Sequence, residues 1–341
     1  MKNYLGSLLF TLVAVSVAFF FLGGVDAAVT VMLLGILETS MSFDNAVVNS
    51  GILKNWSEAW QRTFMTWGML VAVFGMRLVF PLLVVSIAGH FSPLHALHLA
   101  LSDPRQYAQT LSSTHLQIAA FGGAFLSMVF LKYFIDAEKD KHWLAPIERP
   151  LTRLGKFEAI QAAITMVVVL VAGQALHGAQ SRSFIEAGVL GLVAYIAADA
   201  VKAMFGSEDD LASKVVPATI GGFLYLEMLD ASFSFDGVIG AFAISDNMFV
   251  IALGLGVGAM FVRSMTVHLV RSGVLNEFRY LEHGAFWAIG AMATILFLGV
   301  VTEVPDIITG FIGAAAIASA LVSSVIAKKR EAAQAAQAVA A

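Results

Sequence analysis

The sequence predicts an all-α membrane protein, a polytopic helix bundle of about ten spans, and three observations carry this prediction. Hydrophobic residues make up 59% of the 341 positions and charged residues only 13%, whereas soluble domains carry about 25% charged residues. The mean hydropathy is +0.82. Apolar residues are spread along the whole chain rather than gathered in one anchor. Lipid is the solvent for such a chain, and a spanning helix satisfies all of its own backbone groups there.

Each of the predicted spans is an apolar segment of about the length that crosses the hydrocarbon core of a bilayer. The ten segments lie near residues 4–24, 28–53, 64–89, 114–135, 158–178, 183–204, 217–245, 248–270, 285–301 and 306–327. Between them, residues 90–113 predict an external helix on the membrane surface. The Ala- and Gln-rich end, residues 328–341, predicts a disordered cytoplasmic tail.

The distribution of Lys and Arg predicts the orientation of the bundle. If the N-terminus is cytoplasmic and every segment spans, sixteen Lys and Arg residues fall inside and two fall outside, Arg105 and Arg182. Such a bias is typical of multi-pass proteins, in which short cytoplasmic loops are basic. We therefore expect a protein of the cell's inner (plasma) membrane with both termini in the cytoplasm. The net charge of −4 gives no sign of a nucleic-acid partner.

Two acidic motifs lie inside predicted spans and match each other. Ser-Met-Ser-Phe-Asp-Asn ends at Asn45, and Ser-Phe-Ser-Phe-Asp-Gly ends at Gly237; each has a carboxylate six residues before its Asp. The two spans are second in their halves of five and run in opposite directions. This pattern predicts an inverted repeat, residues 1–178 and 179–327, with a substrate site at the midplane between the motif helices.

The motifs predict a site for a divalent cation. A charged group inside a membrane costs about 3 kcal/mol or more, and neither motif span contains a Lys or Arg. Carboxylate, hydroxyl and amide oxygens without any thiolate suit Mn²⁺, Mg²⁺ or Ca²⁺. The candidate ligands are Glu38, Ser42, Asp44, Asn45, Asp230, Ser234 and Asp236, with Ser40, Asn49, Glu227, Ser232 and Arg263 as accessory candidates. Protonated acids that hydrogen-bond between helices are the structural alternative.

The spacing of these residues sets a condition on the two helices. On a straight helix Glu38 and Asp44 point in nearly opposite directions, and so do Asp230 and Asp236. Asn, Asp, Ser and Gly compete with the helix for backbone hydrogen bonds. We therefore expect both helices to break near their Ser-Phe-Asp sequences, so that the carboxylates converge.

The same residues carry a resemblance to a known family. The segment from Asp230 through Asp236 to Asp246, followed by Arg263, resembles the second signature of the TerC family of integral membrane proteins. Glu38 through Asn45 resembles its first acidic signature, and more closely that of a TerC-related branch described as a domain of unknown function. The resemblance implies a metal-ion transporter, linked mostly to manganese export, and places the ion at Glu38, Asp44, Asn45, Asp230 and Asp236. Gly237 departs from the Ser of better-known members.

Further residues have a structural and a functional interpretation. Arg77 and Arg263 lie within spans and need carboxylate partners, for which Asp199 and the motif acids are candidates; we expect ion pairs that support the structure. The glycines at 254, 256 and 258 indicate close helix packing rather than a nucleotide loop. Three histidines at the outer face are candidate metal ligands, although such residues are more often interfacial polar groups: His90, His95 and His98.

These observations favour a secondary transporter over an enzyme. The leading hypothesis is export of a divalent cation, Mn²⁺ before Ca²⁺ or Mg²⁺, in exchange for protons. We expect no tightly bound cofactor; the partners are the lipid bilayer, the metal ion, protons and, as a candidate, further copies of the chain. The first alternative is an intramembrane aspartyl enzyme built on Asp44 and Asp236. The second is a membrane scaffold that loads metal onto secreted proteins.

Overall fold

The computed structural model describes residues 4–340 apart from 69, 89–90, 138, 140, 158, 206–215, 217, 243, 246, 274–277, 303 and 305. The side chains at 65, 88, 201–205, 234–236, 239, 306–307, 309–310, 332–333 and 335–340 also lie outside the described part.

The described residues form helices joined by short connections, with no strand among them, which confirms the predicted all-α bundle. The first half, with π-helical segments labelled η, contains α1 (Leu5–Val17), η2 (Ala18–Gly23), α2 (Gly24–Met41), α3 (Phe43–Leu53), α4 (Glu58–Thr63), η3 (Phe64–Gly68), η4 (Val71–Val79), α5 (Phe80–Ala88), α6 (Pro93–Ser102), α7 (Pro104–Ser113), α8 (His115–Phe134), α9 (Ala145–Leu154) and α10 (Ile160–Gln174). The second half contains α11 (Ala179–Phe205), α13 (Ile220–Phe242), α14 (Met248–Ser272), α16 (Leu281–Leu298) and α17 (Asp306–Ala340).

Seven continuous helical runs in the described part are long and apolar enough to cross a membrane, fewer than the ten predicted segments. The difference has three causes. The first run, Leu5–Met41, covers two predicted segments. Helix α10 has only 15 residues, or about 22 Å of rise. Helix α13 is 23 residues long but carries Glu227, Asp230 and Asp236. The protein is a multi-pass membrane protein.

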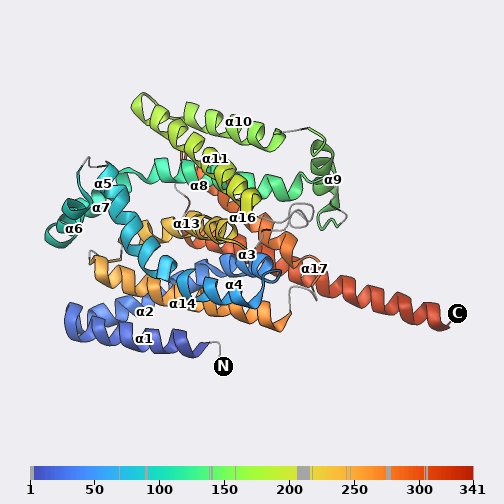
Figure 1. Cartoon of the computed structure of the whole chain (residues 1–341), viewed down its shortest axis with the longest axis horizontal. Helices are drawn as coiled ribbons and strands as arrows, with labels where there is room; N and C mark the ends of the chain where they lie inside the picture. The colour runs from blue at the N-terminus through green and yellow to red at the C-terminus, as the bar shows by residue number, and fades with distance from the viewer. Residues whose placement is uncertain are drawn as a thin grey trace.

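The first helical run reverses its direction at two glycines. Gly23 has φ of 150° and Gly24 has φ of 68°, backbone conformations that L side chains rarely adopt. As a result α2 folds back along α1, and the two lie side by side at one edge of the bundle, with α10 and α11 at the opposite edge (Figure 1).

Helix α14 is surrounded by other helices of the bundle and contacts α1, α2, α3, η4 and α13. Its glycines allow this packing, as predicted. A Cβ at Gly254 would lie 2.6 Å from Leu34 Cβ, and one at Gly258 would lie 2.3 Å from Glu38 Cβ. The close approach of α2 to α14 therefore presses Glu38, the first carboxylate of the first motif, into the interior.

Two segments outside the core differ in part from expectation, one in the first half of the chain and one at its C-terminal end. The segment predicted to be external forms two helices, α6 and α7, that pack on each other and on α5, each with a proline in its first turn. The C-terminal segment has a helical backbone as far as Ala340, where we predicted a disordered tail, and it extends beyond the bundle (Figure 1). Alanine, glutamine and lysine are strong helix formers, which accounts for this helix.

Candidate functional site

The first motif breaks its helix as predicted, and the second does not. Helix α2 ends at Met41, Ser42 has φ of −98° and ψ of 21°, and α3 begins at Phe43. In contrast, the backbone of α13 is helical from Ile220 to Phe242, through the whole second motif. The expectation of a break there was wrong: packing within the bundle overrides the low helix propensity of Ser, Asp and Gly.

Glu38 is neutralised by an arginine from another helix. Arg77 of η4 places Nη2 at 2.5 Å from Glu38 Oε1, and the side chains are 2% and 4% exposed. Ser42 Oγ donates to the same oxygen at 3.2 Å. Arg77 also donates to the carbonyl oxygen of Ala72. The prediction that Arg77 pairs with a motif acid is confirmed; Asp199, the other candidate, pairs with Lys132 at 2.5 Å.

The second motif is joined to the first by two asparagine side chains that are hydrogen-bonded in series. Asn45 Nδ2 donates to Asp230 Oδ1. Asn49 Nδ2 donates to Asn45 Oδ1 at 2.9 Å. Asp230 Oδ2 and Asn49 Oδ1 are buried and have no hydrogen-bond partner among the described residues. A buried oxygen without a donor is costly, so these two atoms are available ligands for a cation.

A second buried ion pair lies beside this chain. Arg263 Nη2 of α14 is 3.3 Å from Glu227 Oε1 of α13. The guanidinium also stacks on the ring of Phe64, 4.0 Å from its centroid. Gly68 leaves the room for this pair, because a Cβ there would lie 2.0 Å from Arg263 Nη2 and 2.3 Å from Glu227 Oε1.

These groups surround a cavity of about 10 Å³ between α2, α3, η4, α13 and α14, close to the volume that one water molecule needs. The polar residues of its wall are Glu38, Ser42, Asn45, Asn49, Arg77, Asp230, Arg263 and Thr266. Together with Glu227, the described side chains supply three carboxylates and two guanidinium groups. Glu38 and Glu227 each make an ion pair with one of the arginines, and Asp230 makes none among the described residues.

The structure places other predicted ligands away from this cavity. Asp44 faces α17, where a Cβ at Gly313 would lie 2.9 Å from Asp44 Oδ2. Ser40 and Ser232 donate to carbonyl oxygens one turn back, those of Ile36 and Met228. The side chains of Ser234 and Asp236 lie outside the described residues. Among side chains within the described part, no group of three or more His, Asp or Glu could hold a metal ion.

The histidines predicted to lie at the outer face do not gather into a site in the described part of the chain. His95 and His98 are exposed on α6. The His98 ring lies 3.3 Å from Ser102 Oγ, and the His95 ring packs edge-on against Phe91. His90 lies outside the described residues.

Comparison with known proteins gives a family but no activity. The family described as "Protein of unknown function (DUF475)" matches residues 43–331, more than four fifths of the 341-residue chain. The chain belongs to the DUF475 family. The match includes Asp44, Asn45 and the whole second motif. No curated protein and no solved structure matches this DUF475 protein, and the likeness to TerC proteins stays a resemblance.

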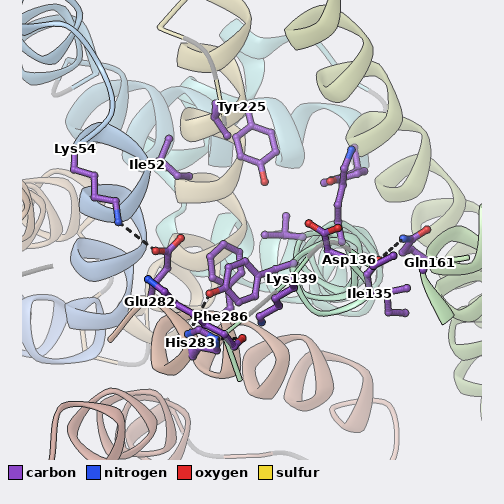
Figure 2. A pocket seen from close by; sticks show the side chains of 18 of the residues that line it. Ile52, Lys54, Ile135, Asp136, Lys139, Gln161, Tyr225, Glu282, His283 and Phe286 are labelled. Carbon is purple, nitrogen blue, oxygen red and sulfur yellow. Dashed lines mark hydrogen bonds and ion pairs between the residues drawn. The ribbon is translucent and has the colours of Figure 1, made fainter. Parts of the chain in front are cut away.

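A large open cavity of about 860 Å³ lies at the end of the DUF475 bundle that was predicted to face the cytoplasm, where α3, α8, α13 and α16 meet. Figure 2 shows Tyr225 with its hydroxyl directed into this space, and Lys54 joined to Glu282 at one side of it; Lys54 Nζ is 3.2 Å from Glu282 Oε2. Ile52 comes three residues after Asn49, and Tyr225 five residues before Asp230. The cavity therefore reaches to within about two helical turns of the polar site on both motif helices.

Glu148 of α9 is fully buried and contacts two residues that line this cavity, Lys139 at 3.8 Å and His283 at 3.7 Å. Its carboxylate accepts hydrogen bonds from the backbone N–H groups of Trp143 and Leu144 and from Trp287 Nε1. Burial alone would raise the pKa of Glu148, but these donors, with Lys139 and His283 nearby, hold the pKa below its ordinary value. Burial lowers the pKa of Lys139 to about 8, in spite of Glu148 at 3.8 Å. The network fixes the basic loop against α16.

Cysteine labelling tests whether the large cavity opens to the predicted cytoplasmic side. The chain has no Cys, so a single introduced thiol is unique. We expect Ile52→Cys to react with a membrane-impermeant thiol reagent in inside-out vesicles and not in right-side-out ones. Val31→Cys is the matched control, because Val31 is 0% exposed within the bundle. Labelling of Ile52→Cys only in right-side-out vesicles would show that the predicted orientation of the bundle is wrong.

Proposed function

We propose that this protein is a secondary transporter of a divalent metal cation, with manganese export in exchange for protons as the leading hypothesis. One observation carries the proposal. Asp230 is a buried carboxylate that makes no ion pair within the described part of the chain. Its Oδ2 and Asn49 Oδ1 accept no hydrogen bond from the described residues, and both residues line the same cavity. Uncompensated intramembrane acids mark ion pathways.

The arrangement supports a mechanism in which the transported cation and Arg77 compete for the carboxylate of Glu38. Hard divalent cations take carboxylate and amide oxygens, and Asp230, Asn45 and Asn49 supply these at one place. A divalent ion needs a second carboxylate. Glu38 lines the same cavity but is held by Arg77. In this proposal the arriving ion draws Glu38 away from Arg77, and the guanidinium takes Glu38 back, or a proton binds Asp230, when the ion leaves.

The inner cavity supports alternating access. It is open at the end of the bundle that the basic loops predict to be cytoplasmic. Ile52 and Tyr225 of its wall lie within about two helical turns of the polar site. The polar site itself has room for about one water molecule. This combination fits a transporter with its inner vestibule open and its ion site closed.

Transport by reconstituted protein tests the proposal. Wild-type protein in liposomes with an imposed pH gradient is expected to move Mn²⁺, measured with a trapped Mn²⁺-quenched fluorophore, and Ca²⁺ and Mg²⁺ are compared as competitors. We expect Asp230→Asn to reduce the initial rate at least tenfold. Asp26→Asn, an exposed acid of α2, is the control and should keep the wild-type rate. Equal rates for Asp230→Asn and wild type would reject Asp230 as the ion ligand.

A further inference from the structure

A third cavity is lined by Glu227 and opens to the surface of the bundle beside the half-exposed Leu224. It has a volume of about 280 Å³ and lies between η4, α5, α8, α13 and α16. Its walls are almost entirely apolar, formed by residues such as Met76, Ile118, Phe121 and Leu296. Small residues keep it open: Gly122 on α8 and Ala231 on α13 line it. Its size is at the lower end for a small-molecule site.

Glu227 is the one charged residue among the described residues that line this cavity. The residue is 6% exposed. Its Oε1 faces Arg263 at 3.3 Å, while its Oε2 is buried and has no hydrogen-bond partner in the described part of the chain. The ion pair with Arg263 therefore uses one oxygen of the carboxylate and leaves the other in need of a donor.

We propose that this cavity binds a small hydrophobic amine, with its apolar body against the cavity walls and its protonated amino group donating to Glu227 Oε2. The apolar walls exclude hydrated ions, and the carboxylate repels anions. A protonated amine is the ligand that uses both features, because it satisfies the orphan oxygen through a charge-assisted hydrogen bond. The inference rests on the contacts of Glu227 and does not depend on metal transport.

A lipid acyl chain is the competing occupant, and a pair of isosteric probes distinguishes the two. An acyl chain would use the apolar walls and leave Glu227 Oε2 without a donor. Phenethylamine and 2-phenylethanol have the same shape, and the amine alone is charged at pH 7. We expect the full-length wild-type protein in detergent to bind phenethylamine at least about tenfold more tightly, measured by isothermal titration calorimetry. Equal affinities, or binding of neither probe, would overturn the proposal.

Two variants locate the binding. Ala231→Leu fills the cavity while keeping both members of the Glu227–Arg263 pair, and it should abolish phenethylamine binding. Ala200→Leu, the same change on an exposed face of α11, should not. Glu227→Gln should remove the preference for the amine over the alcohol. Because that variant leaves Arg263 without its carboxylate and can fail to fold, Ala231→Leu is the deciding comparison. Unchanged binding in Ala231→Leu would place the amine elsewhere and refute the site.

Discussion

Replacing Arg77 with glutamine is expected to destabilise the protein by about 3–5 kcal/mol, because it leaves Glu38 as a buried charge without a partner. Both side chains of this pair are almost fully buried, at 2% and 4% exposure, and the separation is 2.5 Å. The adjoining cavity has room for about one water molecule, so water can solvate the Glu38 carboxylate only to that extent. Unfolding of the purified protein in mixed detergent micelles, titrated with SDS, measures the loss.

Two further variants serve as controls for the Arg77→Gln measurement. The double variant Glu38→Gln with Arg77→Gln removes both charges and should recover most of the lost stability, because uncharged amides can bond each other. Arg62→Gln breaks a pair with Glu58 whose side chains are 74% and 84% exposed; such surface pairs contribute about 0–1 kcal/mol. If Arg77→Gln lowers the free energy of unfolding no more than Arg62→Gln does, the buried pair does not stabilise the fold.

A methyl group at Gly191 is expected to separate α8 from α11. A Cβ at Gly191 would lie 2.2 Å from the carbonyl oxygen of Phe121, 2.9 Å from its carbonyl carbon and 3.0 Å from its Cα. These are backbone atoms, so no side-chain rotation relieves the clash and one helix must move. Overpacking of this kind costs about 1–3 kcal/mol, and we expect Gly191→Ala to reach or exceed the upper end in the same SDS titration.

The control for this substitution is Gly51→Ala in α3. A Cβ there meets nothing within 4 Å, and alanine is favoured over glycine in a helix by about 1 kcal/mol. Gly51→Ala should therefore leave stability unchanged or raise it. A Gly191→Ala variant as stable as Gly51→Ala would show that the contact between α8 and α11 is not tight at this point.

Local features of the chain could be predicted because their causes lie within a few residues. The helical class follows from apolar segments in a medium that cannot solvate backbone groups. The break after Met41 follows from polar residues that compete for the backbone, and the glycines of α14 follow the rule for close helix packing. In α13 packing overrides local propensity, so prediction and structure differ there. In the C-terminal segment they differ for another reason: its residues are strong helix formers, although its composition had predicted a disordered tail.

The sequence by itself determined that this is a helical membrane protein, that its acids lie within apolar segments, and that two arginines within those segments needed acidic partners. Only the tertiary structure decided which groups meet. Arg77 takes Glu38, Arg263 takes Glu227, and Asn45 reaches Asp230 across 185 positions of chain, which leaves Asp230 without a counter-cation among the described residues. Partner choice depends on where helices cross and on how closely glycines let them approach, and no local pattern contains that information.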